Sequence, residues 1–543
     1  SRKQSGILPM LLYDYSLFYK GFLLNAAARF NSNALFLTDS IEMYQRFKSY
    51  RRRLAIEYAK PIAEQKGIVE LEEKVNTIEK HLVRSFEGYS EVFRKVKWED
   101  VKSSLKIGNA AIEFINFRVK FPQKTDSIVY AALLLKPNEN RPIFIPLFEE
   151  RAIDSLLQSK SERRADYVNT LYTLADRGAV VIGAPKKSLY EILWEPIEKE
   201  LSGIKTIYFS PSGLLHRINL DAIPISQTET LADKYQLIEL SSTRQLVITA
   251  PKQNLINDAV LYGGVHFDLD SAKQERESVL ASRTNEVLSF NMVDSTLRSG
   301  TWTYLPGSEK EVNSIQKILM NSGFQTNLKS ANEATEETFK RLGANNISSP
   351  RVLHIATHGY FFPDRTSSST GRMARDSAVS EGTAKTASIK PQFIESEEPV
   401  FKMSDHPMLR SGLIMAGGNA AWQGKQTLEG REDGILTAYE ISQMNLSNTE
   451  LVVLSACETG LGDIQGNEGV YGLQRAFKIA GAKYLIMSLW QVPDKQTSLL
   501  MITFYKKWLE DKMSIPDAFH AAQKELRDVG LDPYQWAGFV LVE

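Results

Sequence analysis

Two short apolar runs in the second half of the chain each end in a reactive side chain. Residues 351–358 read RVLHIATH and end at His358, and residues 451–457 read LVVLSAC and end at Cys457. Runs of this kind are typical of strands buried on both faces in a parallel sheet. Because open α/β sheets place their chemistry beyond the carboxyl ends of the strands, the pattern predicts that His358 and Cys457 form a Cys–His dyad.

Further apolar runs, separated by helical segments, predict the rest of an α/β fold. Two consecutive runs predict a pair of strands, and a third run containing two prolines favours a sheet edge. A β-α-β-α-β order leads to the His358 strand, which argues for right-handed crossovers and a mainly parallel sheet. The predicted strands are 111–117, 128–135, 141–147, 206–210, 259–264 and 484–489, and the predicted late helices are 495–510 and 515–528.

The first 95 residues show helical rather than strand periodicity. Apolar residues recur at i, i+3 and i+4 through 68–86, with Glu and Lys on the other faces. Another helix is predicted to start with a capping box, Ser308 as N-cap and Glu311 three residues later.

Small residues beside both reactive side chains favour acyl-transfer chemistry. The backbone N–H groups of Gly359 and Cys457 are predicted to hold an oxyanion. A lone buried Cys is usually a small apolar residue and a lone His usually structural, so the prediction depends on the pair. His354, four residues before His358, is expected on the same face of one strand and beneath the site, as a hydrogen-bonded core residue.

These motifs together resemble the CHAT family of caspase-like cysteine peptidases, which are related to separase. The resemblance is carried by HIATHG, by LSACETG 99 positions later, and by GNEGVYGLQRAF, AGAKYLIMSLWQVPD and YQWAGFVLV. It implies three parts: N-terminal helices like the end of a tetratricopeptide array at 1–95, an inactive caspase-like domain at 96–255, and an active peptidase domain at 256–543. A Ser-, Thr- and Gly-rich insert at about 364–400 is expected to be disordered and open to self-cleavage.

The resemblance also sets an expectation for the substrate pocket. Relatives in this clan that cut after Arg carry an acidic residue shortly after an LWxVxD segment, and here the corresponding position is Ser498. Asp494, Glu468 or Asp463 are the candidate replacements, with Trp490 beside them, and a basic P1 residue is the favoured hypothesis. Alternatively, Asp494 is only the N-cap of the next helix.

Composition removes several classes of function. Lys plus Arg and Asp plus Glu number 65 each, so no global field favours nucleic acid or anionic membrane. No P-loop is present. One cysteine excludes an internal disulfide and fits a cytoplasmic protein. No zinc-ligand spacing occurs, so we expect no metal or other cofactor.

The sequence therefore predicts a cysteine endopeptidase that cleaves a protein substrate. A protein activator is expected to bind the N-terminal helices, and family analogy suggests a role in bacterial regulation or defence. The alternative is a catalytically silent scaffold with a caspase fold. A second site at Ser210, Ser212 and His216 is a further hypothesis, although no Cys or glycine-rich loop lies nearby in the sequence.

Overall fold

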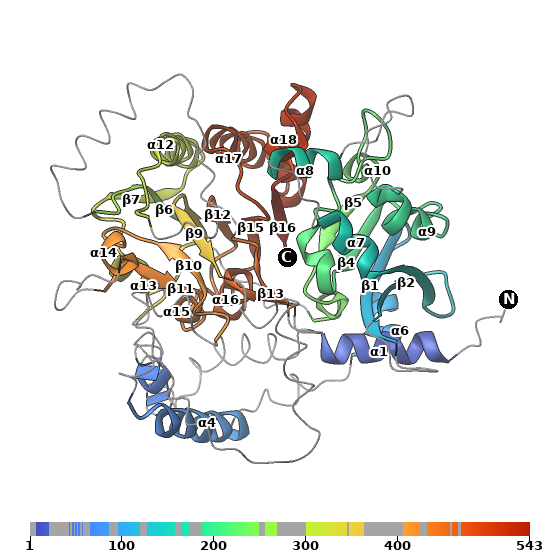
Figure 1. Cartoon of the computed structure of the whole chain (residues 1–543), viewed down its shortest axis with the longest axis horizontal. Helices are drawn as coiled ribbons and strands as arrows, with labels where there is room; N and C mark the ends of the chain where they lie inside the picture. The colour runs from blue at the N-terminus through green and yellow to red at the C-terminus, as the bar shows by residue number, and fades with distance from the viewer. Residues whose placement is uncertain are drawn as a thin grey trace, which may run out of the picture.

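The fold was examined in a computed structural model of the chain (Figure 1). It describes residues 7–20, 43, 46–47, 49–51, 53–54, 57, 66–85, 96–119, 127–157, 164–172, 187–248, 256–268, 300–344, 347–362, 406–423, 432–456, 459–464 and 469–543. The expected insert at 364–400 lies outside these residues.

One large, mainly parallel sheet organises the described chain. Its strand order is β3-β2-β1-β4-β5-β16-β15-β12-β8-β6-β7, and antiparallel neighbours occur at β3–β2, β2–β1 and β15–β16. The predicted α/β fold class is therefore confirmed. The strands are β1 (Asn109–Arg118), β2 (Ile128–Leu135), β3 (Ile143–Glu149), β4 (Thr206–Ser210), β5 (Gln236–Glu239), β6 (Asp258–Val265), β7 (Gln325–Ala331), β8 (Val352–Ile355), β12 (Leu451–Leu454), β15 (Tyr484–Ser488) and β16 (Phe539–Val542).

The two halves of the chain share this sheet. Strands β1 to β5 lie on one side of Figure 1 and the later strands on the other, and they join where the last strand, β16, lies parallel to β5. Glu543 N donates to Glu239 O across the join at 2.9 Å. The sheet thus runs through the predicted boundary near residue 255, and the division into two caspase-like domains stays a prediction.

Helices cover both faces of the C-terminal half. α12 (Pro306–Asn321), α17 (Asp494–Leu509) and α18 (Ile515–Asp528) lie side by side above the sheet in Figure 1, and α15 (Ala438–Ile441) and α16 (Leu473–Ala480) lie below it. Strands β8 and β12 are fully buried between these layers because every side chain in them is apolar or, as in His354, internally bonded.

Two smaller sheets stand beyond the carboxyl ends of these strands. One has the order β11-β10-β9, with β9 (His358–Phe361), β10 (Ser411–Ile414) and β11 (Ile435–Thr437). The other is a hairpin of β13 (Gly462–Ile464) and β14 (Val470–Gly472). The remaining elements are α6 (Trp98–Ser104), α7 (Glu150–Leu157), α8 (Arg164–Leu171), η4 (Tyr190–Trp194), α9 (Glu195–Glu198), η5 (Gly213–Arg217), α10 (Leu231–Lys234), η6 (Thr243–Leu246), α13 (Glu336–Lys340), α14 (Asn419–Trp422) and α19 (Pro533–Trp536).

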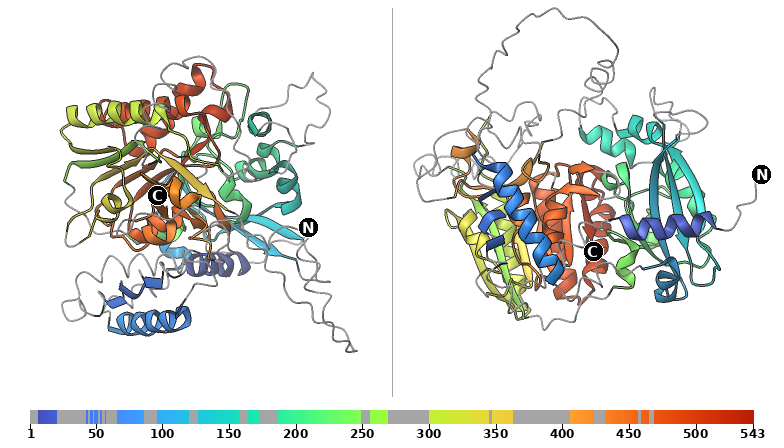
Figure 2. Two further views of the ribbon diagram at one scale, coloured as in Figure 1. Left: turned by 60° about the vertical axis from the view of Figure 1, so that its left-hand side comes forward. Right: turned by 90° about the horizontal axis from the view of Figure 1, so that it is seen from below.

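The N-terminal region contributes two longer helices, α1 (Leu8–Tyr19) and α4 (Ile68–Ser85), as the periodicity predicts. Figure 2 shows α1 lying across the strands of the N-terminal half. In α4, Leu71 and Val75 of the predicted stripe are buried. Among the described helices, none is both long and apolar enough to cross a bilayer.

Candidate active site

Strands β8 and β12, which precede the two predicted dyad residues in the sequence, end at the same edge of the sheet. The strands are adjacent and parallel, with Ile355 opposite Leu454. His358 and Cys457 each come three residues after the end of their strand. Cys457 and Glu458 lie outside the described residues, so the site is built from the residues around them.

His358 does not continue strand β8, which corrects the prediction of a single strand carrying both histidines on one face. The run breaks after Ile355, and His358 opens β9, which pairs with β10 so that His358 lies opposite Ile414. Thr357 stabilises the break by donating its hydroxyl to Ile414 O at 2.6 Å. The imidazole therefore belongs to the small sheet beyond the carboxyl ends of the main-sheet strands.

A backbone carbonyl and two aromatic rings surround the His358 imidazole. Its Nε2 lies 2.8 Å from Thr303 O. The rings of Trp302 and Phe267 pack against it with centroids 4.8 and 5.0 Å away. Sequence patterns did not identify Thr303, because every residue carries a backbone carbonyl and only folding selects one.

These contacts define the protonation of the ring. A carbonyl oxygen only accepts, so Nε2 carries the proton and Nδ1 is left as the acceptor in the neutral ring. Burial lowers the pKa of His358 to about 4, while the bond to Thr303 opposes that shift. The imidazole is thus neutral at physiological pH, with one nitrogen engaged and one able to accept a proton.

Residues on both sides of Cys457 in the sequence form hydrogen bonds with Ser488, the last residue of β15. Ser488 Oγ donates to Ala456 O at 2.6 Å, Ser488 N donates to Thr459 Oγ1 at 3.0 Å, and Gly460 N donates to Ser488 O at 2.7 Å. Only Cys457 and Glu458 separate these anchored residues. The ends of this two-residue segment are therefore fixed relative to the main sheet. The predicted oxyanion donor Gly359 is the second residue of β9, where it is buried opposite Leu413.

His354 lies beneath the site, as predicted for a core residue. It is fully buried, with Nε2 2.8 Å from Glu311 Oε1 and Nδ1 3.3 Å from the Tyr505 hydroxyl. The predicted capping box is wrong. The helix starts at Pro306, so Ser308 is not its N-cap. Ser308 Oγ accepts from Gly264 N at 3.0 Å, and the Glu311 carboxylate hydrogen-bonds to the His354 imidazole.

Asp494 and Trp490 have internal partners. Asp494 Oδ2 accepts from Gly307 N at 2.7 Å, at the start of α12, and Asp494 is the first residue of α17 rather than its N-cap. Trp490 is 4% exposed, and its Nε1 donates to Tyr534 O at 2.9 Å. This placement favours structural roles for both side chains.

Replacing Asp494 by asparagine is expected to stabilise the protein at pH 8. Burial, followed by the nearby Glu311 carboxylate, raises the pKa of Asp494 to about 6. A raised carboxyl pKa contributes stability that is present below about pH 4 and lost as the pH rises through about 6. The gain at pH 8 should reach at most about 3 kcal/mol. Urea unfolding at pH 5 and pH 8 measures it, and a variant that instead loses a preference for basic P1 residues would assign Asp494 to substrate binding.

Asp463, the other described acidic candidate, is already paired. Its carboxylate forms an ion pair with the buried Arg410 guanidinium, which also donates to Phe362 O at 3.0 Å. The pair connects the β13–β14 hairpin to the end of β9. Glu468 lies outside the described residues.

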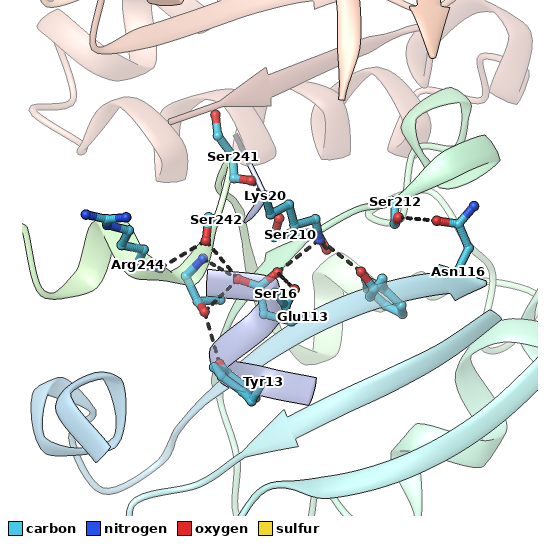
Figure 3. A network of polar contacts seen from close by, with 12 residues as sticks. Tyr13, Ser16, Lys20, Glu113, Asn116, Ser210, Ser212, Ser241, Ser242 and Arg244 are labelled. Atoms are coloured by element: carbon cyan, nitrogen blue, oxygen red, sulfur yellow. Dashed lines mark hydrogen bonds and ion pairs between the residues drawn. The ribbon is translucent and has the colours of Figure 1, made fainter. Parts of the chain in front are cut away.

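The second-site hypothesis at Ser210, Ser212 and His216 receives no support from the bonding there (Figure 3). Ser210 Oγ donates to Ser241 O at 2.8 Å and Ser212 Oγ donates to Asn116 Oδ1 at 2.7 Å. Burial, followed by the nearby Lys20 ammonium, lowers the pKa of His216 to about 3. Both hydroxyls thus donate to other oxygen atoms, which favours a structural arrangement.

A buried ion pair anchors helix α1 to this region (Figure 3). Lys20 Nζ lies 3.0 Å from Glu113 Oε2 and donates to Phe114 O and Ser210 O at 2.9 and 2.7 Å. Glu113 Oε1 accepts from Thr243 N at 2.6 Å and from its hydroxyl at 2.8 Å. Every polar atom of the pair is thereby satisfied, which lets two charges sit in the interior.

Three carboxylates near α13 come close enough to hold a metal ion: Glu336, Glu432 and Glu440. Lys340 already supplies a positive charge there. Its Nζ lies 2.6 Å from Glu440 Oε1 and 3.3 Å from Glu432 Oε2, and it also pairs with Glu336. The cluster is therefore better described as a salt-bridge network.

Comparison with solved structures finds matches at low sequence identity. The Saccharomyces cerevisiae separase–securin complex matches with a TM-score of 0.42 and 11% sequence identity, covering 84% of this chain and 31% of that chain. The Arg-specific cysteine proteinase gingipain R, RgpB of Porphyromonas gingivalis, matches with a TM-score of 0.34 and 10% identity, covering 64% of each chain.

Sequence comparison gives a family. Tetratricopeptide repeat protein 28 of Mus musculus is 32% identical over 111 residues, which is 20% of this chain but only 4% of the mouse protein. The human protein of the same name is 31% identical over 110 residues, again 20% of this chain and 4% of its own length. The family described as CHAT domain matches residues 183–543, two thirds of the chain. The protein therefore belongs to the CHAT domain family.

Proposed function

We propose that the protein is a cysteine endopeptidase in which Cys457 is the nucleophile and His358 the proton carrier. The main observation that supports this proposal is the strand pairing. In the sequence, each residue comes three positions after the end of its strand, and the two strands are adjacent, parallel and in register. The neutral imidazole, with Nε2–H donated to Thr303 O, leaves Nδ1 as the nitrogen that would face the thiol.

In this mechanism the Cys457 sulfur attacks the scissile carbonyl carbon, forming a C–S bond as the thiol proton passes to His358. The oxyanion is held by backbone N–H groups, for which Gly359 and Cys457 are the candidates. His358 then gives its proton to the leaving amine as the C–N bond breaks, and its low pKa suits it to this acid step. Water hydrolyses the thioester and restores the thiol.

The proposal extends to a protein partner at the N-terminal region. Helix α1 is apolar on both sides: Tyr13 and Leu17 are buried, whereas Leu8, Leu11, Tyr15 and Tyr19 form an exposed stripe at helical spacing. An activator that binds there would act on a helix already tied to the sheet by Lys20. The biological role that follows from this proposal is cleavage of a protein substrate in the bacterial cytoplasm, controlled by the activator.

A peptide electrophile tests the proposal without knowledge of the substrate. Wild type, Cys457→Ala and His358→Ala are treated with a set of peptidyl acyloxymethyl ketones of varied P1 residue, and adducts are located by mass spectrometry. Wild type should be labelled at Cys457 for some P1 residues and the His358→Ala protein much more slowly. Equal labelling of wild type and His358→Ala would instead support a silent scaffold.

A further inference from the structure

Asn419 makes a paired hydrogen bond to the segment that carries the Thr303 carbonyl. Its Oδ1 accepts from Trp302 N at 2.7 Å, and its Nδ2 donates to Trp302 O at 3.0 Å. The side-chain amide thus satisfies both backbone groups of Trp302, as a neighbouring strand would. Asn419 is 1% exposed, so water does not compete for these bonds.

The backbone of Asn419 is fixed in turn to the other wall of the site. Asn419 N donates to Phe267 O at 3.0 Å, and Gly417 N donates to His266 O at 3.0 Å. Trp422, on the same short helix, packs its ring against Trp302 with centroids 4.8 Å apart. Asn419 therefore joins the backbones of Phe267 and Trp302, whose rings both contact His358.

We infer that Asn419 is a positioning residue for His358, acting through Trp302 and Thr303. The inference rests on the proposed function, because it assigns the residue that holds the proton carrier in one tautomer. The next residue after Trp302 supplies the carbonyl that accepts from Nε2. Farther along the segment, the Tyr304 ring packs edge-on against His266 with centroids 5.8 Å apart, and Gly307 N donates to Asp494 Oδ2.

Both ends of the amide are needed for this role. An amide offers one acceptor and two donors on a planar group, so it matches the N–H and C=O of a single residue. Without it, residues 300–305 have no strand partner in the part of the chain that the structure describes, and the Thr303 carbonyl loses its fixed distance from the ring. The imidazole could then exchange between its two neutral tautomers, and displacements of about 1 Å are enough to cost a proton carrier about 10²-fold in rate.

The test compares Asn419→Ala with Asn219→Ala. Asn219 is a matched control because it is 2% exposed and its side-chain amide also donates and accepts. It donates to Ala537 O and Phe539 O and accepts from Asp221 N. Phe539 begins β16, which is three strands away from β8 in the sheet. The tautomer of His358 is read from the imidazole ¹⁵N shifts of full-length protein labelled at its 7 histidines, with His358→Gln to assign the signal.

Wild type and Asn219→Ala should show the Nε2–H tautomer, and Asn419→Ala a mixture. On the peptide that wild type cleaves fastest in a library, kcat should fall about 10- to 100-fold in Asn419→Ala with KM little changed. Asn419→Asp keeps the size and the acceptor but sets a carboxylate oxygen against Trp302 O, so it should also give a mixture of tautomers and serves if the alanine variant does not fold. An unchanged tautomer in both variants would overturn the inference. Absence of Cys457-dependent cleavage in wild type would overturn the proposed function instead, and the tautomer comparison would still decide the role of Asn419.

Discussion

Peptide hydrolysis is expected to fall by about 10²- to 10⁴-fold in kcat when His358 is replaced by alanine, because the thiol then loses its proton acceptor and the leaving amine its acid. Cys457→Ala should lose at least as much, since it is the only cysteine in the chain and no other thiol can replace it. The double variant should be no slower than Cys457→Ala alone, because the two residues act as a unit. Cleavage of a proteome-derived peptide library, followed by mass spectrometry, measures all three.

His520→Ala is the matched control for His358. His520 lies on α18 and its Nε2 is 2.9 Å from Asp221 Oδ2, so its loss also removes a part-buried, bonded imidazole. Its activity should equal that of wild type at temperatures where both are folded. If His358→Ala and His520→Ala proved equally active, the role assigned to His358 would be refuted.

Lys20→Met is expected to lower the free energy of unfolding by about 3–5 kcal/mol. The substitution leaves Glu113 as an unpaired charge at a site with no solvent exposure, and breaking a buried pair from one side costs about that much. Adding Glu113→Gln should recover part of the loss, because the uncompensated charge is removed. Urea denaturation, followed through the first unfolding transition, measures both variants.

The surface pair Lys74–Glu70 supplies the control for this prediction. The two side chains are 45% and 71% exposed and four residues apart on α4, so Lys74→Met should cost far less stability than Lys20→Met. Equal losses in Lys20→Met and Lys74→Met would show that the Lys20–Glu113 contact does not stabilise α1 on the sheet.

The apolar pattern predicted most strands of the main sheet but missed β5 and β7. Strands buried on both faces, such as β12 and β15, appear as continuous runs, and the two prolines of 141–147 correctly placed β3 at an edge. The break between Ile355 and His358 could not be predicted, because Ala356 and Thr357 fit a strand as well as a turn. It depends on β10, which begins 50 positions after the last residue of β9 and pairs with it.

The residues around the candidate site were harder to predict than the dyad itself. His358 and Cys457 combine rare, reactive side chains with strand ends, whereas Thr303 acts through its carbonyl and Asn419 through an amide common on protein surfaces. Glu311 resembled a capping residue in sequence because its partner, His354, is 43 positions away. Contacts between distant segments decide these roles, and local spacing does not contain them.

The pH dependence of Cys457 alkylation tests the central claim most directly. Iodoacetamide reacts with the thiolate, and the single cysteine makes the signal unambiguous. In a Cys–His dyad the imidazole takes up the thiol proton, and the imidazolium so formed stabilises the thiolate and lowers the pKa of the thiol. Wild type should therefore react at pH 6 at least about 10-fold faster than His358→Ala, whose profile should follow an ordinary thiol with a pKa of about 8.5. Superimposable profiles for the two proteins would contradict a Cys457–His358 dyad.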